Sequence, residues 1–199
     1  MTCIKKNLNK TEDVILKQIS ESIKTKEFLL NDCFLKKVMQ ASAMLIGALK
    51  KNRKVFLCGN GGSAADCQHW AAEMTGRFLR ERKALGFISL TTNTSEITSI
   101  GNDYSFERIF SRQIEGLGKK GDVLICISTS GRSENILAAA ATAKKMGLKV
   151  ISLTGKAPNL LAKKADVEIS VPSVQTPRIQ EAHCLIMHIL CHLVEDSLF

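Results

Sequence analysis

Residues 55–63 read VFLCGNGGS, an apolar run that passes directly into a glycine-rich turn. The run predicts a buried strand, and the pattern that begins near Ala64 predicts a helix immediately after the turn. Backbone N–H groups in such a turn, next to the positive end of a helix dipole, favour the binding of an anion. The same helix carries His69 and Glu73, which are four residues apart and therefore share one helix face. The segment thus combines a candidate phosphate site with a candidate acid–base or metal-binding pair.

The remainder of the chain alternates between strand and helix patterns. One helix pattern, Glu134–Met146, ends at Gly147, as helices commonly end at a glycine. Strands buried on both faces and separated by helices indicate a three-layer α/β/α fold, with a doubly wound parallel sheet of about five strands. The predicted strands are Val55–Cys58, Leu85–Leu90, Val123–Ile127, Lys149–Leu153 and Val167–Val171.

Further helices are expected at both ends of the chain. Thr11–Leu30 and Asn31–Lys51 are amphipathic, whereas Arg178–Val194 is apolar on all sides, which predicts burial between layers or in an oligomer core. The 199 residues contain no repeat and no linker-like segment, and this length suits one domain. We therefore expect a single domain over residues 1–199, with a helical segment at 1–52 used in oligomerisation and an α/β core with a C-terminal helix at 53–199.

The composition narrows the class of protein. Seven cysteines without CxxC spacing, several of them inside apolar runs, are typical of reduced core residues rather than of a disulfide framework. No apolar run approaches the ~18–20 residues that cross a bilayer, and the N-terminus lacks an apolar signal core. A cytoplasmic protein without a membrane partner is the expectation.

The formal net charge of +9 indicates an anionic partner. The lysine pairs are spaced widely along the chain, and one Tyr and one Trp offer little surface on which bases could stack. We therefore expect solvated lysine faces and no nucleic-acid partner. A small phosphate ester needs only a few of these charges.

A second loop, residues 128–133, reads STSGRS and lies between a predicted strand and a predicted helix. Its hydroxyl groups can donate hydrogen bonds to a phosphate beside a helix N-terminus. A helix N-cap would account for Ser130 or Ser133 alone, but four hydroxyls with a glycine exceed that role. A third loop, GNDY at 101–104, is a polar turn that turn chemistry explains as well as substrate contact does. Neither a Walker sequence nor GxGxxG with a later acidic residue is present, so the pattern favours a small phosphate ester.

The final helix pattern adds further polar side chains, namely Gln180, His183, His188 and His192. His183 and His192 are interpreted as packed core residues, although His188 and His192 could form a metal pair of their own. Gln180 and His188 are separated by ~12 Å of rise and ~80° of rotation on a regular helix. The spacing therefore supports His188 acting with Glu73 better than it supports Gln180 as a metal ligand.

Taken together in this order, the motifs resemble the phosphoheptose isomerase (sedoheptulose 7-phosphate isomerase) family of the sugar isomerase (SIS) domain superfamily. The resemblance runs from about residue 40 to the C-terminus, and the five motifs at compatible spacing are specific. They are GNGGS at 59–63, His69 with Glu73, GND at 101–103, STSGxS at 128–133, and RIQExH with His188 at 178–188.

The resemblance implies an aldose–ketose isomerase that converts sedoheptulose 7-phosphate to D-glycero-D-manno-heptose 7-phosphate through an enediol. The product would serve nucleotide-activated heptose biosynthesis, as for lipopolysaccharide. It also implies a homotetramer with active sites at subunit interfaces. Glu73 and His188 would be the catalytic residues, and one Zn²⁺ per subunit would be bound at His69, Glu73, Gln180 and His188. The implied substrate contacts are Asn60, Gly61, Gly62, Ser63, Glu73, Asn102, Asp103, Ser128, Thr129, Ser130, Ser133 and Gln180.

One position departs from the family pattern, because Pro177 stands where many members carry an acidic residue before the Arg-Ile-Gln run. Any supporting role of that carboxylate is not carried over to this chain. Two alternative functions stay open. One is a non-catalytic SIS-domain protein that binds phosphosugars or is associated with a replication initiator, for which the catalytic positions would be replaced. The other is an isomerase of a different phosphosugar.

Overall fold

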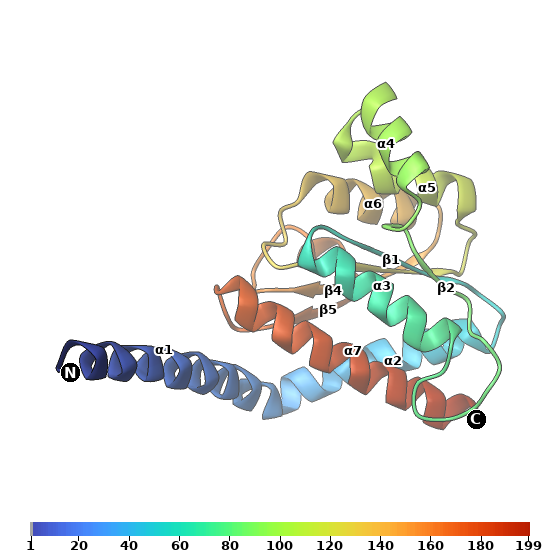
Figure 1. Cartoon of the computed structure of the whole chain (residues 1–199). Coiled ribbons are helices and arrows are strands. Elements are labelled where there is room, and N and C mark those ends of the chain that lie inside the picture. The colour runs from blue at the N-terminus through green and yellow to red at the C-terminus, as the bar shows by residue number, and fades with distance from the viewer. Residues whose placement is uncertain (1) are drawn as a thin grey trace.

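Five parallel strands form the sheet at the centre of the molecule (Figure 1). The structure, a computed structural model, describes residues 2–199, with side chains from Lys10 onward. The strand order is β2-β1-β3-β4-β5, and every neighbouring pair is parallel. The strands are β1 (Val55–Gly59), β2 (Phe87–Ser89), β3 (Val123–Ser128), β4 (Lys149–Thr154) and β5 (Val167–Ser170). The predicted doubly wound parallel sheet is confirmed.

Helices cover both faces of the sheet. On one face lie α2 (Asp32–Leu49), α3 (Gly62–Thr75) and α7 (Thr176–Leu198), and on the other lie α4 (Thr94–Asp103), α5 (Ile109–Leu117) and α6 (Glu134–Lys145) (Figure 1). Side chains of β1 alternate between the two cores, because successive residues of a strand point to opposite faces. Val55 and Leu57 pack with the first set of helices, and Phe56 and Cys58 pack with the second.

The chain reverses its direction of winding between β1 and β3. From β1 it moves outward to β2, and then it returns past β1 to continue through β3, β4 and β5. In open parallel sheets the crevice at this switch point, beyond the carboxyl ends of the strands, is the usual ligand site. The loops that follow β1 and β3 are residues 60–61 and 129–133, so the two predicted phosphate loops meet here.

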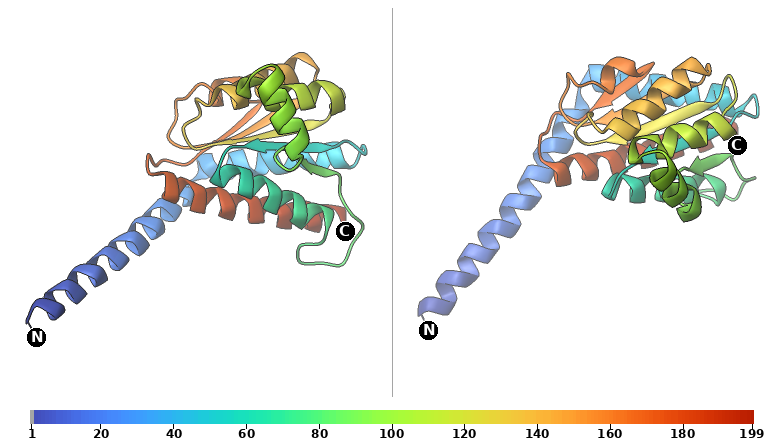
Figure 2. Two further views of the ribbon diagram at one scale, coloured as in Figure 1. Left: turned by 45° about the horizontal axis from the view of Figure 1, so that its top comes forward. Right: turned by 90° about the horizontal axis from the view of Figure 1, so that it is seen from above.

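The N-terminal helix α1 (Thr2–Glu27) projects away from the rest of the chain (Figures 1 and 2). A short 3₁₀ helix, Phe28–Leu30, connects it to α2, and Asn31 caps α2 by accepting a hydrogen bond from the Phe34 backbone N–H at 2.9 Å. Two helices were predicted in this region, and α1 begins earlier than predicted. Its apolar side chains are more than half exposed at Val14, Ile15, Leu16, Ile19 and Ile23.

The C-terminal helix α7 is longer than the predicted Arg178–Val194. It begins at Thr176, and Pro177 lies in its first turn, where a backbone N–H is not needed. In the single chain one side of the helix is buried, and burial of the other side in an oligomer core stays a prediction. Leu185, Ile189 and Leu193 form a stripe that is more than one third exposed. None of the described helices combines the length and apolar character needed to cross a membrane.

Candidate active site

The glycine loop after β1 has two positions, Gly61 and Gly62, at which a side chain would be strained or would collide with a neighbour. Gly61 has a φ of +54°, in the left-handed region that favours glycine, and it precedes the first residue of α3. A Cβ at Gly62 would lie 2.2 Å from the amide nitrogen Nε2 of Gln180. The Gln180 side chain of α7 therefore packs directly on the backbone of this loop. The structure thus brings two motifs together that are more than one hundred residues apart.

Asn60 joins the glycine loop to α6. Its amide and that of Asn135 form two reciprocal hydrogen bonds, each 2.9 Å long. Asn135 is buried at the start of α6. Sequence reasoning missed Asn135, although a buried amide in the first turn of an otherwise alanine-rich helix is unusual enough to have been noticed. The pair holds the loops after β1 and β3 at a fixed separation.

The hydroxyl loop after β3 folds around Gly131, whose φ is +61°. The Oγ of Ser128 accepts a hydrogen bond from the Gly131 backbone N–H at 3.2 Å and lies 3.2 Å from the Oγ of Ser133. Ser133 occupies the N-cap position of α6, but its side chain makes no capping hydrogen bond. Its hydroxyl lies beside the helix N-terminus, paired with that of Ser128, as expected for two groups that could bind phosphate together.

A hollow of about 280 Å³ lies against this loop. Thr129 and Ser130 line one part of it, and Arg132 and Lys156 contribute two positive charges. These two cations were not predicted as site residues, although Arg132 lies within the quoted loop. Hydroxyl donors and two cations around one hollow suit a phosphate group.

The predicted acid–base residues lie together where α3 and α7 pack side by side. The Nε2 of His69 is 3.0 Å from Oε1 of Glu73, and the rings of His69 and His188 meet edge to face with centroids 5.2 Å apart. Phe78 stacks on His188 at a centroid distance of 5.7 Å. The side chains of His69 and Glu73 are 44% and 25% exposed, so the cluster is open to solvent. Glu73 and His188 thus flank the same imidazole, one on each helix.

Two further polar side chains were missed at this cluster. The Sγ of Cys184 and one ring nitrogen each of His69 and His188 all lie within 4.8 Å of one another. Asp66, one turn before His69, has a buried Oδ2 without a hydrogen-bond partner among the described residues. Burial raises the pKa of Asp66, and the nearby His69 partly offsets that rise. The sequence signal for Cys184 was its place midway between Gln180 and His188.

A buried ion pair holds the two helices of the cluster at their far ends. Arg82 and Glu195 are each 1% exposed and lie 3.0 Å apart. The Arg82 guanidinium donates to the carbonyls of Glu73, Met74 and Gly76, which caps the C-terminal end of α3. Glu195 of α7 accepts hydrogen bonds from the backbone N–H groups of residues 78–80. The pair therefore fixes the segment that presents Phe78 to His188.

Other predicted residues lie elsewhere. Asn102 and Asp103 were predicted in a turn, but they are the last residues of α4 and are exposed; the Asn102 amide donates to Asp103 at 2.9 Å. No hydrogen bond described in the structure joins them to the rest of the site. His183 is buried and lies 3.2 Å from the Thr154 carbonyl, and burial lowers its pKa to about 4. His192 is exposed beside Asp196, so its interpretation as a core residue is wrong.

Residues 31–155 match the family described as SIS domain. A phosphoheptose isomerase of Nitratiruptor is 57% identical over 160 residues, which are 80% of this chain and 86% of the relative. One of Clostridium acetobutylicum is 51% identical over 183 residues, 92% of this chain and 93% of the relative. A solved phosphoheptose isomerase of Neisseria gonorrhoeae superimposes with a TM-score of 0.88 at 40% identity and covers 94% of this chain and 99% of its own.

Proposed function

Since the chain belongs to the phosphoheptose isomerase family of SIS-domain proteins, we propose that it interconverts sedoheptulose 7-phosphate and D-glycero-D-manno-heptose 7-phosphate. The chain is a phosphosugar isomerase, and its product serves heptose biosynthesis. The observation that carries the proposed mechanism is the placement of Glu73 and His188 around His69, where α3 and α7 pack together. Of the functions left open by the sequence, relatives with these names favour the heptose isomerase over a non-catalytic regulator.

The reaction moves a proton between C1 and C2 of an open-chain sugar through an enediol. Glu73 is the base that removes and returns the carbon-bound proton, and its contact with His69 holds the carboxylate in place. His188 handles the proton on the carbonyl oxygen, since an imidazole can change charge near neutral pH. The Phe78 ring stacked on His188 fixes the plane of that imidazole.

The phosphate end of the substrate would be bound far from these two residues. Ser128, Thr129, Ser130 and Ser133 present hydroxyls at the start of α6, with Arg132 and Lys156 beside them. Asn60, Gly61, Gly62, Ser63 and Gln180 would contact the sugar between the two ends. Binding energy from the phosphate then positions the reacting carbons. Roles for Asn102 and Asp103 stay a prediction.

A metal ion also fits the cluster. The imidazoles of His69 and His188 and the carboxylate of Glu73 are the ligand types that zinc takes, and the unpartnered Oδ2 of Asp66 lies on the same helix. We propose one Zn²⁺ per subunit at this position. When bound, zinc would polarise the substrate carbonyl. Gln180, the fourth predicted ligand, packs its amide on Gly62.

We further propose a homotetramer in the cytoplasm. The exposed apolar side chains of α1 and the exposed stripe on α7 offer surfaces for self-association. The cysteines that the structure describes are free, which suits a reducing compartment. Size-exclusion chromatography with light scattering tests the assembly, and a monomer at micromolar concentration would contradict it.

The activity is tested by incubating the purified protein with sedoheptulose 7-phosphate and following the aldose product by NMR. Matched reactions contain fructose 6-phosphate, to detect a different substrate preference, or a chelator, to detect a metal requirement. Turnover of the heptose phosphate well above that of the hexose phosphate is expected. No turnover with any phosphosugar would favour the non-catalytic function instead.

A further inference from the structure

Gln180, Cys184 and His188 follow one another on α7 at intervals of four residues. Each step advances about 6 Å and turns about 40° around the helix, so the three side chains form a continuous stripe. Gln180 and His188 are eight residues apart, so both the rise and the rotation between them are twice as large. Cys184 therefore lies nearer to the His188 ring than Gln180 does by helix geometry alone.

The packing of the two helices gives Cys184 a second neighbour. Its Sγ lies within 4.8 Å of a ring nitrogen of His69 on α3 and of a ring nitrogen of His188 on its own helix. The two histidine nitrogens also lie within 4.8 Å of each other. Three donors from two rigid helices, within the spread that one ion can bridge, form a partial coordination sphere. A helical platform also keeps the donors in place before the ion arrives.

The amide nitrogen of Gln180 lies 2.2 Å from the position that a Cβ on Gly62 would take, so this side chain packs against the glycine loop. The sulfur of Cys184, by contrast, already lies close to the two histidine nitrogens.

We propose that Cys184 is a ligand of the metal ion in this chain, together with His69 and His188. The inference rests on the zinc site in the proposed function and changes its ligand set. On binding, the metal displaces the thiol proton to solvent, and a sulfur–metal bond forms. One thiolate and the Glu73 carboxylate then balance the two charges of Zn²⁺, whereas an amide in place of the thiolate would leave one positive charge. A thiolate also selects zinc over magnesium or manganese.

Cobalt spectroscopy tests the assignment without using activity. The metal-free protein is titrated with Co²⁺, and a thiolate ligand produces an intense sulfur-to-cobalt charge-transfer band in the near ultraviolet. We expect this band in the unaltered chain and in Cys33→Ser, which changes an exposed cysteine on α2. In Cys184→Ser the band should disappear while the visible cobalt bands remain. Zinc affinity, measured by competition with a chelator, should fall about tenfold or more.

A cobalt-loaded protein without the charge-transfer band would overturn the proposal, and so would a band that survives in Cys184→Ser. The spectrum of the unaltered chain decides the question even if that variant folds poorly, and Cys184→Ala provides a second substitution. The cobalt band tests the ligand, whereas turnover tests the isomerase activity. A protein that shows the band but no turnover would contradict the proposed activity and still support Cys184 as a ligand.

Discussion

At the carboxyl ends of the strands the chain places helix N-termini and hydroxyl side chains, whereas at the amino ends it places helix C-termini and lysines. The first edge holds the loops after β1 and β3, with Ser128–Ser133 before α6. The second edge holds the ends of α2, α5 and α6, with Lys51, Lys119 and Lys145 at or just beyond them. Helix dipoles point their positive ends toward the first edge and their negative ends toward the second.

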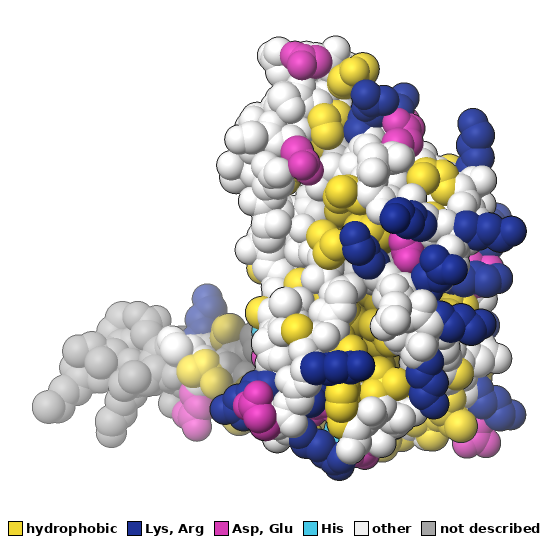
Figure 3. Space-filling view, turned by 90° about the vertical axis from the view of Figure 1, so that its right-hand side faces the viewer, with side chains coloured by type: hydrophobic (Ala, Val, Ile, Leu, Met, Phe, Trp, Pro, Cys, Tyr) yellow, Lys and Arg dark blue, Asp and Glu magenta, His cyan; other side chains and the backbone are white. Residues whose placement is uncertain are grey.

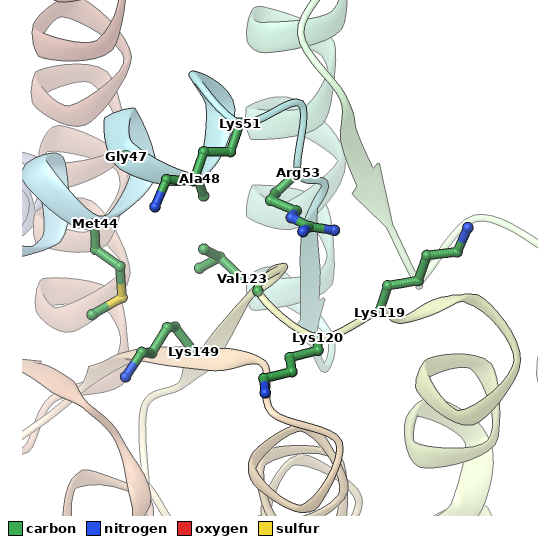
Figure 4. Close-up of a pocket in the computed structure, with 10 residues that line it drawn as sticks. Met44, Gly47, Ala48, Lys51, Arg53, Lys119, Lys120, Val123 and Lys149 are labelled. Atoms are coloured by element: carbon green, nitrogen blue, oxygen red, sulfur yellow. The ribbon is translucent and has the colours of Figure 1, made fainter.

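The basic edge is conspicuous on the surface. Figure 3 looks onto it and shows Lys and Arg side chains gathered there. A hollow of about 620 Å³ lies at this edge, and no acidic side chain lines it. In Figure 4 the side chain of Lys119 points away from the other cations. The cations of the hollow are Lys51, Arg53, Lys119, Lys120 and Lys149.

Size and charge would make this hollow the obvious anion site, but the backbone opposes that. Helix carbonyls converge at this edge, and lysines beside them stabilise the helix ends. The aspartates at this edge also accept hydrogen bonds from backbone N–H groups. Asp122 accepts hydrogen bonds from the N–H groups of Lys54 and Lys119, and Asp166 accepts one from Val150. The carboxyl edge is therefore suited to binding an anion, whereas the charges of the amino edge stabilise helix and strand ends.

The largest effect is expected at the cluster of His69, Glu73 and His188, where α3 and α7 pack together. Glu73→Gln and His188→Ala should each lower kcat by about a thousandfold, since a positioned acid or base contributes 10²–10⁴-fold. Circular dichroism and the oligomeric state should not change. Glu81→Gln, an exposed carboxylate on the loop after α3, is the matched control. Near-normal turnover in either variant would remove the acid–base assignment.

The buried ion pair between Arg82 and Glu195 is expected to contribute a free energy comparable to that of the catalytic residues, but to the stability of the fold rather than to catalysis. Either Arg82→Met or Glu195→Gln leaves a buried partner uncompensated, which typically costs about 3–5 kcal/mol of unfolding free energy. The melting temperature should fall by about 10 °C. Arg80→Gln, which breaks the exposed pair with Asp196, is the control and should change it little. A small loss in the buried variants would show that the far ends of α3 and α7 are held by apolar packing alone.

The pH dependence of stability sharpens this point. Burial raises the pKa of Glu195, but hydrogen bonds from the Leu79 and Phe78 N–H groups and from Arg82 outweigh it, so the folded-state pKa lies below the ordinary 4.5. The stabilisation is therefore fully present above pH 4.5 and is lost as the pH falls through the lower folded-state value. Denaturant unfolding from pH 7 to pH 3 should show the difference between the unaltered chain and Glu195→Gln shrinking in acid. A constant difference would contradict the lowered pKa.

A smaller effect is expected in the hydroxyl loop. Ser130→Ala and Ser133→Ala each remove one hydrogen bond to a charged phosphate, which is worth about 1.5–3 kcal/mol. KM for the phosphosugar should rise about tenfold or more, with a smaller change in kcat. Inhibition by inorganic phosphate should weaken in parallel, which a purely structural role of the serines would not produce. Ser99→Ala, on exposed α4, is the control.

The sequence predicted the strands well because each is a short apolar run bounded by turn residues. It also identified both loops at the switch point, since glycine and serine patterns act locally. Asn135, Cys184 and the Arg82–Glu195 pair were missed because their contacts depend on how α3, α6 and α7 cross the sheet, which no local pattern specifies. The segment 101–103 was predicted as a turn from its glycine, yet the helical hydrogen bonds of α4 continue to Tyr104.

Most lysines are exposed to solvent, as predicted, but several pairs lie together at one edge of the sheet. Pairs such as Lys119–Lys120 and Lys144–Lys145 are far apart in sequence, which indicated dispersed, solvated faces. Each pair, however, follows or ends a helix of a strand–helix repeat, and in a parallel sheet all such positions return to one edge. Wide spacing along the chain therefore concentrated the charge instead of diluting it.

The smallest effect is expected from removing that charge. Lys51→Gln, Lys120→Gln and Lys149→Gln combined should leave KM for the phosphosugar within about twofold at physiological salt. A strand such as β3, with six residues, spans about 20 Å, whereas the Debye length is about 8 Å at 0.15 M salt. At 0.01 M salt that length grows to about 30 Å, so a modest rise in KM should emerge only there. A large rise at physiological salt would mean that the basic edge takes part in substrate capture, and the two edges would then share the work.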